Sequence, residues 1–220
     1  MTEAGTALRL TLPADYRHAD VQRFYARDRE QVSERTTGQR IEKALHWQGH
    51  PTLLQLDFSE PGSVLAQLSI AEPDTTALLH YLRNLLGLNQ DIDGLRIAHG
   101  AHPEIARLLR QTPGLRMPQS ASPFEAACWA VIGQMISVDA AISVRRRVIR
   151  ALGTPLANGM HCHPQPDALL GATPDDLRSC GLSASKAATL IRLAKAVESN
   201  QLPLDTWAAT TPSPAAAIAE

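Results

Sequence analysis

The sequence predicts an α+β protein, with a small N-terminal antiparallel sheet and flanking helices, followed by an all-helical region. Two observations lead to this prediction. Within the first 70 residues, apolar and polar residues alternate as they do in strands that bury one face. From Pro73 onward, apolar residues recur at helical spacing. With 220 residues, 44% of them hydrophobic, the chain can bury one large core or two small ones.

Three strands follow directly from the alternation. Residues 7–12 alternate apolar and polar side chains, and Pro13 ends the pattern. Residues 53–58 and 64–70 have the same pattern. The residues between them, 59–63, are turn-forming, so these two strands should make an antiparallel hairpin.

The segment between the first strand and this hairpin completes the predicted sheet. Residues 32–47 contribute further strands around a turn at residues 37–39. Residues 20–27 predict a short helix that covers one face of the sheet.

The later segments combine helical periodicity with start and stop signals. Ser122 and Thr173 each precede a proline and have an acidic residue three positions on, which is typical of a capped helix start. Ser137 is placed to cap a further helix. Helices are therefore expected over residues 74–86, 103–111, 122–133, 138–152, 173–180 and 185–198.

The two patterns meet near residues 88–96. We therefore predict an N-terminal α+β domain over residues 1–92 and the first part of a helical domain over residues 93–220. The tail from residue 208 is rich in Ala, Thr and Pro and would end a packed domain poorly. Residues 215–220 predict the beginning of a further helix.

Composition excludes several classes of protein. The N-terminus has no basic start followed by a long apolar run, and no window approaches the roughly 18 apolar residues that span a bilayer. We therefore expect a cytoplasmic protein that has no membrane partner. The net charge of −1 argues mildly against a nucleic-acid partner, although an enzyme that grips DNA locally needs only a basic patch.

Cysteine and histidine usage gives little support for a metal site. The three cysteines are widely spaced and form no CxxC pair, so neither a disulfide framework nor a zinc ribbon is indicated. His161, Cys162 and His163 invite a metal interpretation, but neighbouring residues on an extended chain point in opposite directions. We therefore interpret this triplet as a surface loop and expect no metal.

Several motifs occur in an informative order. Residues 113–118 read Pro-Gly-Leu-Arg-Met-Pro, and Phe124-Glu125 follows them. Residues 131–137 read Val-Ile-Gly-Gln-Met-Ile-Ser, and Gly181-Leu182-Ser183 and Lys186-Ala187 come later. Upstream, residues 24–27 read Phe-Tyr-Ala-Arg. This order and spacing resembles the 3-methyladenine DNA glycosylase II family of the helix-hairpin-helix superfamily.

The resemblance implies a function and a partner. It implies a base excision repair enzyme that hydrolyses the N-glycosidic bond of alkylated purines in double-stranded DNA, without a metal or cofactor. It also implies that the complete protein acts as a monomer.

Met135 is the residue that the resemblance implies as the DNA wedge. A base inside a duplex is out of reach, so such an enzyme extrudes it and fills the gap with a side chain. Gly133 and Gln134 should interrupt the helix and leave Met135 and Ile136 on an exposed corner. By periodicity alone Met135 would be ordinary core, and the resemblance favours the wedge.

Other DNA-contacting residues are implied around this corner. The resemblance places Gln134 and Ser137 beside the wedge, and the first amides of the helix after Ser137 could meet a phosphate. Phe24 falls where the family has an aromatic residue lining the base pocket, although core packing explains it equally well. Arg146 and Arg150 share a helix face and could contact phosphate, although a solvated face is the simpler interpretation.

The resemblance also implies a catalytic aspartate after a glycine-rich hairpin, and neither occurs in the 220 residues. The expected aspartate lies beyond Glu220, so we predict no catalytic residue within the chain and negligible turnover by these residues alone. Asp139, Asp175 and Asp176 sit in helix first turns, where capping explains them.

Two alternatives remain open at this stage. The chain could be a non-catalytic DNA- or protein-binding module derived from the glycosylase fold. It could also be an unrelated helical adaptor, in which case the predicted N-terminal sheet would be absent.

Overall fold

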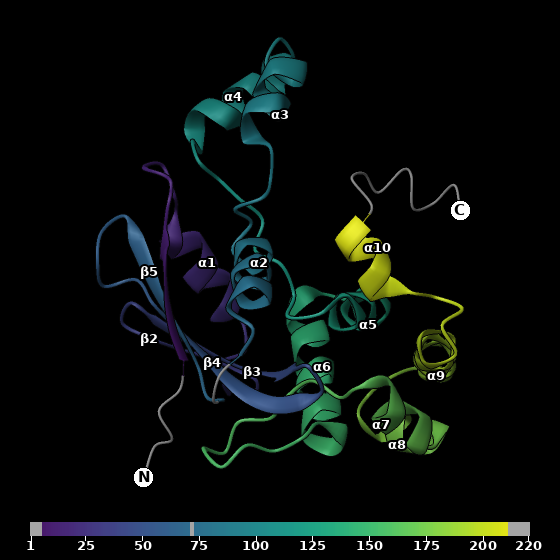
Figure 1. Cartoon of the computed structure of the whole chain (residues 1–220). Coiled ribbons are helices and arrows are strands. Elements are labelled where there is room, and N and C mark those ends of the chain that lie inside the picture. Colours follow the sequence, from purple (N-terminus) through teal and green to yellow (C-terminus); the bar gives the residue numbers. More distant parts are fainter. Residues whose placement is uncertain (1–5, 71–72, 211–220) are drawn as a thin grey trace. The chain divides into compact units, whose positions relative to one another are not determined.

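The computed structural model describes residues 6–70 and 73–210 (Figure 1). It divides into two compact units. The first consists of residues 1–43 and 52–119, and the second of residues 44–51 and 120–220. The segment 44–51 therefore belongs to the second unit, although the chain on both sides of it belongs to the first.

Within the described residues, a five-stranded antiparallel sheet has the order β1-β5-β4-β3-β2 (Figure 1). All the predicted strands are present. The predicted turns at residues 37–39 and 59–63 join β2 to β3 and β4 to β5. This sheet and the helices that follow it confirm the α+β class. The strands are β1 (Thr6–Thr11), β2 (Glu34–Thr37), β3 (Arg40–Trp47), β4 (His50–Asp57) and β5 (Ser63–Leu68).

The apolar sides of the strands meet in the core of the sheet. On β4, Leu54 and Leu56 are buried and alternate with partly exposed residues. Their partners on β5, Leu68 and Ala66, are buried as well. Because side chains two apart lie on one face of a strand, this register places all four on the same apolar face.

Helices α1 (His18–Tyr25) and α2 (Thr75–Leu85) contact the sheet (Figure 1). Both were predicted within two or so residues of these ends. The carboxylate of Asp74 accepts hydrogen bonds from two backbone N–H groups in the first turn of α2 and so starts the helix. The buried face of α2 consists of Leu78, Leu82 and Leu85.

A further helical pair follows α2, namely α3 (Ile92–His99) and α4 (Pro103–Gln111), and it lies at the top of Figure 1. The helix predicted over residues 103–111 is confirmed as α4, whereas α3 was not predicted. Neither helix has a fully buried residue. Ile97 and Leu108 are 86% and 52% exposed, so the pair leaves apolar side chains in solvent.

The Pro-Gly-Leu-Arg segment after α4 has a structural role in the first unit. The Arg116 guanidinium donates to the Gly114 carbonyl (2.9 Å) and lies 5.7 Å from the Tyr16 ring centroid. The Tyr16 hydroxyl donates to the Leu86 carbonyl (2.9 Å), and burial raises the pKa of Tyr16 well above its usual range. Gly114 has φ +69°, and a Cβ there would overlap the carbonyl oxygen of Asp15. Only glycine fits this position.

The described part of the second unit consists of helices, the end of the β3–β4 hairpin and connecting loops, and in the loop between α6 and α7 Pro155 and His161 form an isolated antiparallel bridge. The helices predicted over residues 122–133, 138–152, 173–180 and 185–198 are confirmed, whereas α7 and α10 were not predicted. Helix α9 contacts α5, α7 and α8. The helices are α5 (Pro123–Gly133), α6 (Val138–Leu152), α7 (Pro166–Gly171), α8 (Pro174–Ser179), α9 (Ala184–Glu198) and α10 (Leu204–Thr210).

The predicted capping residues start these helices. Ser122 and Ser137 each accept a hydrogen bond from a first-turn N–H, and Thr173 forms a complete capping box with Asp176. The helices then bury one shared core. Its members include Cys128, Ile132, Ala141, Val148, Leu177, Leu190 and Ala194.

The β3–β4 hairpin ends in a turn at Gln48 and Gly49, which both have positive φ as in a two-residue hairpin turn. Near this end, the His46 ring lies 3.2 Å from Thr154 Oγ1 through Nε2 and 2.9 Å from Gln165 Nε2 through Nδ1. These contacts hold the hairpin end to the loop after α6 within the second unit.

The prediction of a surface loop for the His-Cys-His triplet is wrong. Cys162 and His163 are buried, because the segment packs beneath the hairpin end and beside α5. The Cys162 thiol donates to the Leu45 carbonyl (3.2 Å), and the His163 ring lies edge-on to Phe124 at 6.2 Å. Packing and hydrogen bonding therefore account for both side chains.

The chain passes for the last time from the first compact unit to the second after Gln119, whereas the predicted domain boundary falls between residues 92 and 93. That boundary concerns regions that fold on their own, and it stays a prediction. The helix beginning predicted at residues 215–220 lies outside the described residues. Within residues 6–70 and 73–210, no helix is long and apolar enough to cross a membrane.

Gly114→Ala is expected to lower the free energy of unfolding by about 3 kcal/mol, because it adds a steric overlap to an unfavourable φ. Gly62→Ala is the matched control, since Gly62 has φ +71° but open space around it. It should cost only about 1 kcal/mol. Urea denaturation of both variants measures the difference, and equal losses would contradict the packing role of Gly114.

His46 should make stability depend on pH. Burial lowers the pKa of His46 from its usual value of 6.5, against the attraction of Asp167. The unfolded chain therefore binds the proton more readily than the folded protein. The contribution of neutral His46 to the free energy of unfolding is complete above about pH 6.5 and is lost as the pH falls below that value. His46→Gln should flatten the acid-side decline in unfolding free energy between about pH 7 and about pH 5. If the unfolding free energy of the variant declines as steeply as that of the wild type, groups other than His46 cause the decline.

Candidate functional site

The most exposed of the large apolar side chains in the described residues lies where α5 meets α6. Met135 is 99% exposed, and Ile136 and Val138 are 40% and 61% exposed. Every residue from 134 to 140 is exposed. The predicted exposed corner is therefore present. Apolar residues gathered in solvent are typical of a surface that contacts a partner.

Met135 holds a strained backbone conformation. Its φ is +57°, in the left-handed region that favours glycine. A residue with a Cβ pays about 1–2 kcal/mol for this conformation, and it persists only where neighbouring structure imposes it. The strain therefore points to anchors on both sides of Met135.

The anchor before Met135 is Lys186, near the start of α9. Its ammonium group donates to the Ile132 carbonyl (2.9 Å) and to the Gln134 carbonyl (2.7 Å). Carbonyls in the last turn of a helix have no partner within the helix, and this lysine supplies one. Gln134 itself is exposed, as expected for a contact residue.

The anchor after Met135 is Ser137, the N-cap of α6. Its hydroxyl accepts a hydrogen bond from the Ala140 N–H (3.3 Å). Ser137 is exposed, and so are the first residues of α6, including Asp139. The structure thus brings Gln134, Met135 and Ser137 together at one corner. Their roles toward DNA stay predictions.

A buried ion pair holds α5 against α6. Arg145 donates to the Glu125 carboxylate at 2.6 Å, and the two side chains are only 12% and 7% exposed. Burial, together with the charge of Glu125, raises the pKa of the Cys128 thiol to about 12. The acidic residue expected to cap α5 therefore serves mainly as a tie between the helices.

A shallow hollow lies beside Met135. It has a volume of about 330 Å³ and is formed by the last turns of α5 and the first turn of α6. Trp129, Ile136 and Val138 are among its lining side chains. The corner thus combines a projecting apolar side chain with an adjoining apolar depression.

The arginine-rich stretch of α6 is divided between packing and the surface. Arg145 takes part in the ion pair, and Arg147 donates to the Cys180 carbonyl (2.7 Å). Arg146 is partly exposed and Arg150 is exposed, one helical turn apart. These last two remain the predicted phosphate contacts.

Phe24 lies on α1 of the first unit. It is partly exposed, with the Tyr25 ring edge-on at 5.1 Å and the Arg27 guanidinium over its face at 3.8 Å. Phe24 is therefore neither fully buried core nor a bare aromatic face. Its role as a base-pocket residue stays a prediction.

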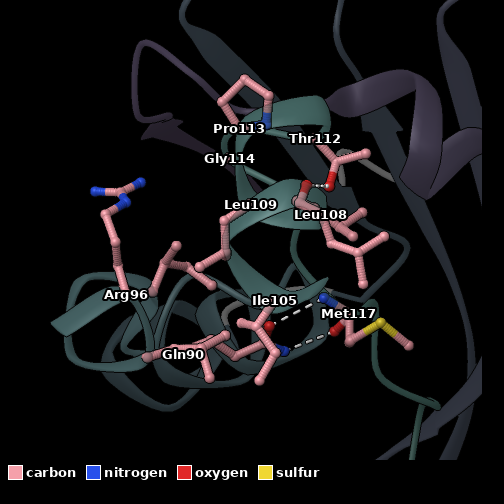
Figure 2. Close-up of a pocket in the computed structure, with 12 residues that line it drawn as sticks. Gln90, Arg96, Ile105, Leu108, Leu109, Thr112, Pro113, Gly114 and Met117 are labelled. Carbon is pink, nitrogen blue, oxygen red and sulfur yellow. Dashed lines mark hydrogen bonds between the residues drawn. The ribbon is translucent and has the colours of Figure 1, made fainter. Parts of the chain in front are cut away.

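The first unit has a cavity of its own, about 260 Å³ in volume (Figure 2). It lies among α3, α4 and the segment that follows α4, and Arg96 is the one charged residue of its lining. The Gln90 side chain forms one wall through hydrogen bonds with the Met117 backbone at 2.7 and 2.9 Å (Figure 2). With a mainly apolar lining, the cavity offers no acid–base pair for catalysis.

The three aspartates considered as catalytic candidates from the sequence, Asp139, Asp175 and Asp176, lie in the first turns of α6 and α8. Asp139 is exposed on the first turn of α6. Asp175 pairs with Arg178 (3.2 Å), and Asp176 is engaged with Thr173 in the capping box. The capping explanation is therefore confirmed for Asp176, whereas the contact of Asp175 is an ion pair with Arg178.

Three residues of the site were not singled out as such from the sequence. Glu125 was assigned to capping, and Arg145 to a general basic cluster. Lys186 was noted only within a motif. A cation in the first turn of a helix is electrostatically unfavourable, and this unusual position is the signal that could have marked Lys186.

Two family models match successive parts of the chain. The family described as "AlkA N-terminal domain" matches residues 7–122. The family described as "HhH-GPD superfamily base excision DNA repair protein" matches residues 128–217. Together these matches cover most of both compact units.

Individual relatives are similar over parts of their length. The DNA-3-methyladenine glycosylase 2 of Escherichia coli (strain K12) is 34% identical over 111 residues, which cover 50% of this chain and 38% of that protein. The 3-methyladenine DNA glycosylase structure from Archaeoglobus fulgidus has a TM-score of 0.75 at 21% identity, covering 86% of this chain and 66% of that one.

A DNA complex has the same fold. The 8-oxoguanine glycosylase/lyase of Clostridium acetobutylicum, solved with double-stranded DNA, has a TM-score of 0.58 at 12% identity. It covers 78% of this chain and 57% of that one. At such low identity, the two structural likenesses show a shared fold.

Met135→Gly should relieve the backbone strain at the corner. We expect the free energy of unfolding to stay unchanged or to rise by up to about 1 kcal/mol, because glycine adopts positive φ without a Cβ clash. Ile136→Gly, at a neighbouring exposed position without positive φ, should instead lose about 1 kcal/mol. Thermal or urea unfolding measures both, and equal losses would show that Met135 is not strained.

Proposed function

The chain belongs to the AlkA N-terminal domain family and to the helix-hairpin-helix superfamily of base excision DNA repair proteins, and on this premise we propose that it serves DNA repair as an alkylbase glycosylase. Its substrate is double-stranded DNA that contains alkylated purines of the 3-methyladenine type. The reaction is hydrolysis of the N-glycosidic bond, with water as the only co-reactant. The protein acts as a cytoplasmic monomer, and neither metal nor cofactor takes part.

The exposed Met135 is the observation that supports this function best. Extruding a base leaves a gap in the stack, and a projecting apolar side chain fills such a gap. Met135 projects fully into solvent, and its backbone is held in a strained conformation at a helix junction. Gln134 and Ser137 flank the wedge and contact the opened duplex, and Phe24 lines the base pocket.

Phosphate contacts complete the proposed interface. The first amides of α6 lie just beyond the wedge, at the positive end of a helix dipole. Arg146 and Arg150 follow on the same helix and neutralise phosphate charge. This local patch provides DNA affinity although the whole chain carries a net charge of −1.

Hydrolysis of the N-glycosidic bond requires a catalytic carboxylate in addition to these DNA contacts. The glycosylase transition state resembles an oxocarbenium ion, which a positioned carboxylate stabilises. None of Asp139, Asp175 and Asp176 stands in a closed site. We therefore propose that these 220 residues supply the binding and opening of DNA in that reaction, and that by themselves they release no bases at a significant rate.

Duplex opening tests the wedge. We expect the protein to raise the fluorescence of a 2-aminopurine base within a duplex, because unstacking relieves its quenching. Met135→Ala should reduce this signal roughly tenfold at equal protein concentration, by loss of the side chain that holds the gap. Leu170→Ala is the matched control, since Leu170 is an exposed apolar residue (39%) on α7. An equal loss in both variants would argue against a wedge.

Base release from methylated duplex DNA tests the chemical proposal. We expect no release above background from these 220 residues. Release that weakens in the Met135→Ala variant would mean that a carboxylate of this chain acts in catalysis. Absence of DNA binding by the wild-type chain would instead favour a protein-binding module.

A further inference from the structure

We propose that Lys186 is a positioning residue, which holds the end of α5 so that Met135 keeps the strained conformation that projects it from the corner. The proposal rests on the proposed function for its consequence in DNA. Its structural part, the link from Lys186 to the backbone before Met135, is independent of that function.

The contact geometry places Lys186 directly before the wedge. The Gln134 carbonyl, 2.7 Å from Nζ, belongs to the peptide group that also contains the Met135 nitrogen. The second acceptor, the Ile132 carbonyl at 2.9 Å, lies in the last turn of α5. By bonding both, Lys186 fixes the orientation of the peptide plane from which Met135 departs. A charged donor makes each bond stronger than a neutral one.

The position of Lys186 in its own helix supports a role at α5. Ser183 caps α9, so Lys186 sits in the first turn, where the helix dipole disfavours a cation. Its ammonium instead reaches the end of α5, where the partial negative charge of the last carbonyls favours it. The side chain therefore connects the positive end of α9 to the negative end of α5.

Both ends of the link are firmly held. Ala187 and Leu190, on the same helix as Lys186, are completely buried in the core, as is Ile132 at 1% exposure. The lysine thus joins two helices of one core. Residues 134–137 connect α5 to α6, and because Ala141 and Val144 of α6 lie in the same core, this connection spans two fixed ends. This constraint explains why a non-glycine residue persists at φ +57°.

Hydrogen exchange tests the structural part of the proposal. We expect Lys186→Met to accelerate exchange of the amides in the last turn of α5 by on the order of tenfold, since that turn loses its C-terminal partner. Peptides from the first unit should be unaffected. Lys195→Met, which removes the same charge from an exposed position on α9, is the matched control and should leave α5 unchanged. Lys186→Arg should restore protection, because a guanidinium can reach both carbonyls.

The 2-aminopurine signal tests whether the link acts through Met135. Lys186→Met should weaken duplex opening about as much as Met135→Ala, and adding it to Met135→Ala should produce little further loss. Additive losses would mean that Lys186 contacts DNA itself, which would overturn the positioning role. So would unchanged exchange at the end of α5 in Lys186→Met.

Failure of the proposed function gives a different pattern. If Met135→Ala leaves duplex opening intact, the proposed role of Met135 as the DNA wedge is wrong. In that case a faster exchange at α5 in Lys186→Met would still establish the link, and an unchanged exchange would reject both.

Discussion

The left-handed backbone at Met135 is the constraint on which the exposed corner of the second unit depends. Helices α5 and α6 are fixed by a common core and by the buried ion pair between Glu125 and Arg145. Only residues 134–137 connect them, so the connection cannot relax into an ordinary turn. The strain is therefore a consequence of packing elsewhere, and it presents an apolar side chain to solvent instead of burying it.

The same corner shows how polar groups are used in this helical unit. A buried carboxylate or guanidinium is unfavourable unless it has a partner, so Glu125 and Arg145 depend on each other. Lys186 donates to carbonyls at the end of α5, where the backbone has no partner within its own helix. Charges are thereby placed where they determine the geometry of the helix junction, and apolar side chains such as Met135 are exposed beside it.

The first unit uses comparable devices around its sheet. Lys43 is 1% exposed and donates to Ser33 (2.9 Å) and to Glu34 (2.6 Å), so a buried ion pair ties β2 to β3. The segment that contains Gly114 and Arg116 packs against Tyr16. That segment is one of the motifs whose order resembles the glycosylase family, and in this structure its residues have a packing role.

The sequence by itself determined the class of fold, most elements and the location of the exposed corner. These features depend on local signals, such as alternation in β4, the capping residues Ser122 and Thr173, and the interruption of a helix at Gly133 and Gln134. Tertiary structure decided the partners of Glu125, Arg145 and Lys186, the burial of Cys162 beneath the hairpin end, and the formation of α3, α7 and α10. Short helices gain most of their stability from packing, and an ion pair between residues 20 positions apart has no local pattern, so neither could be predicted from neighbouring residues.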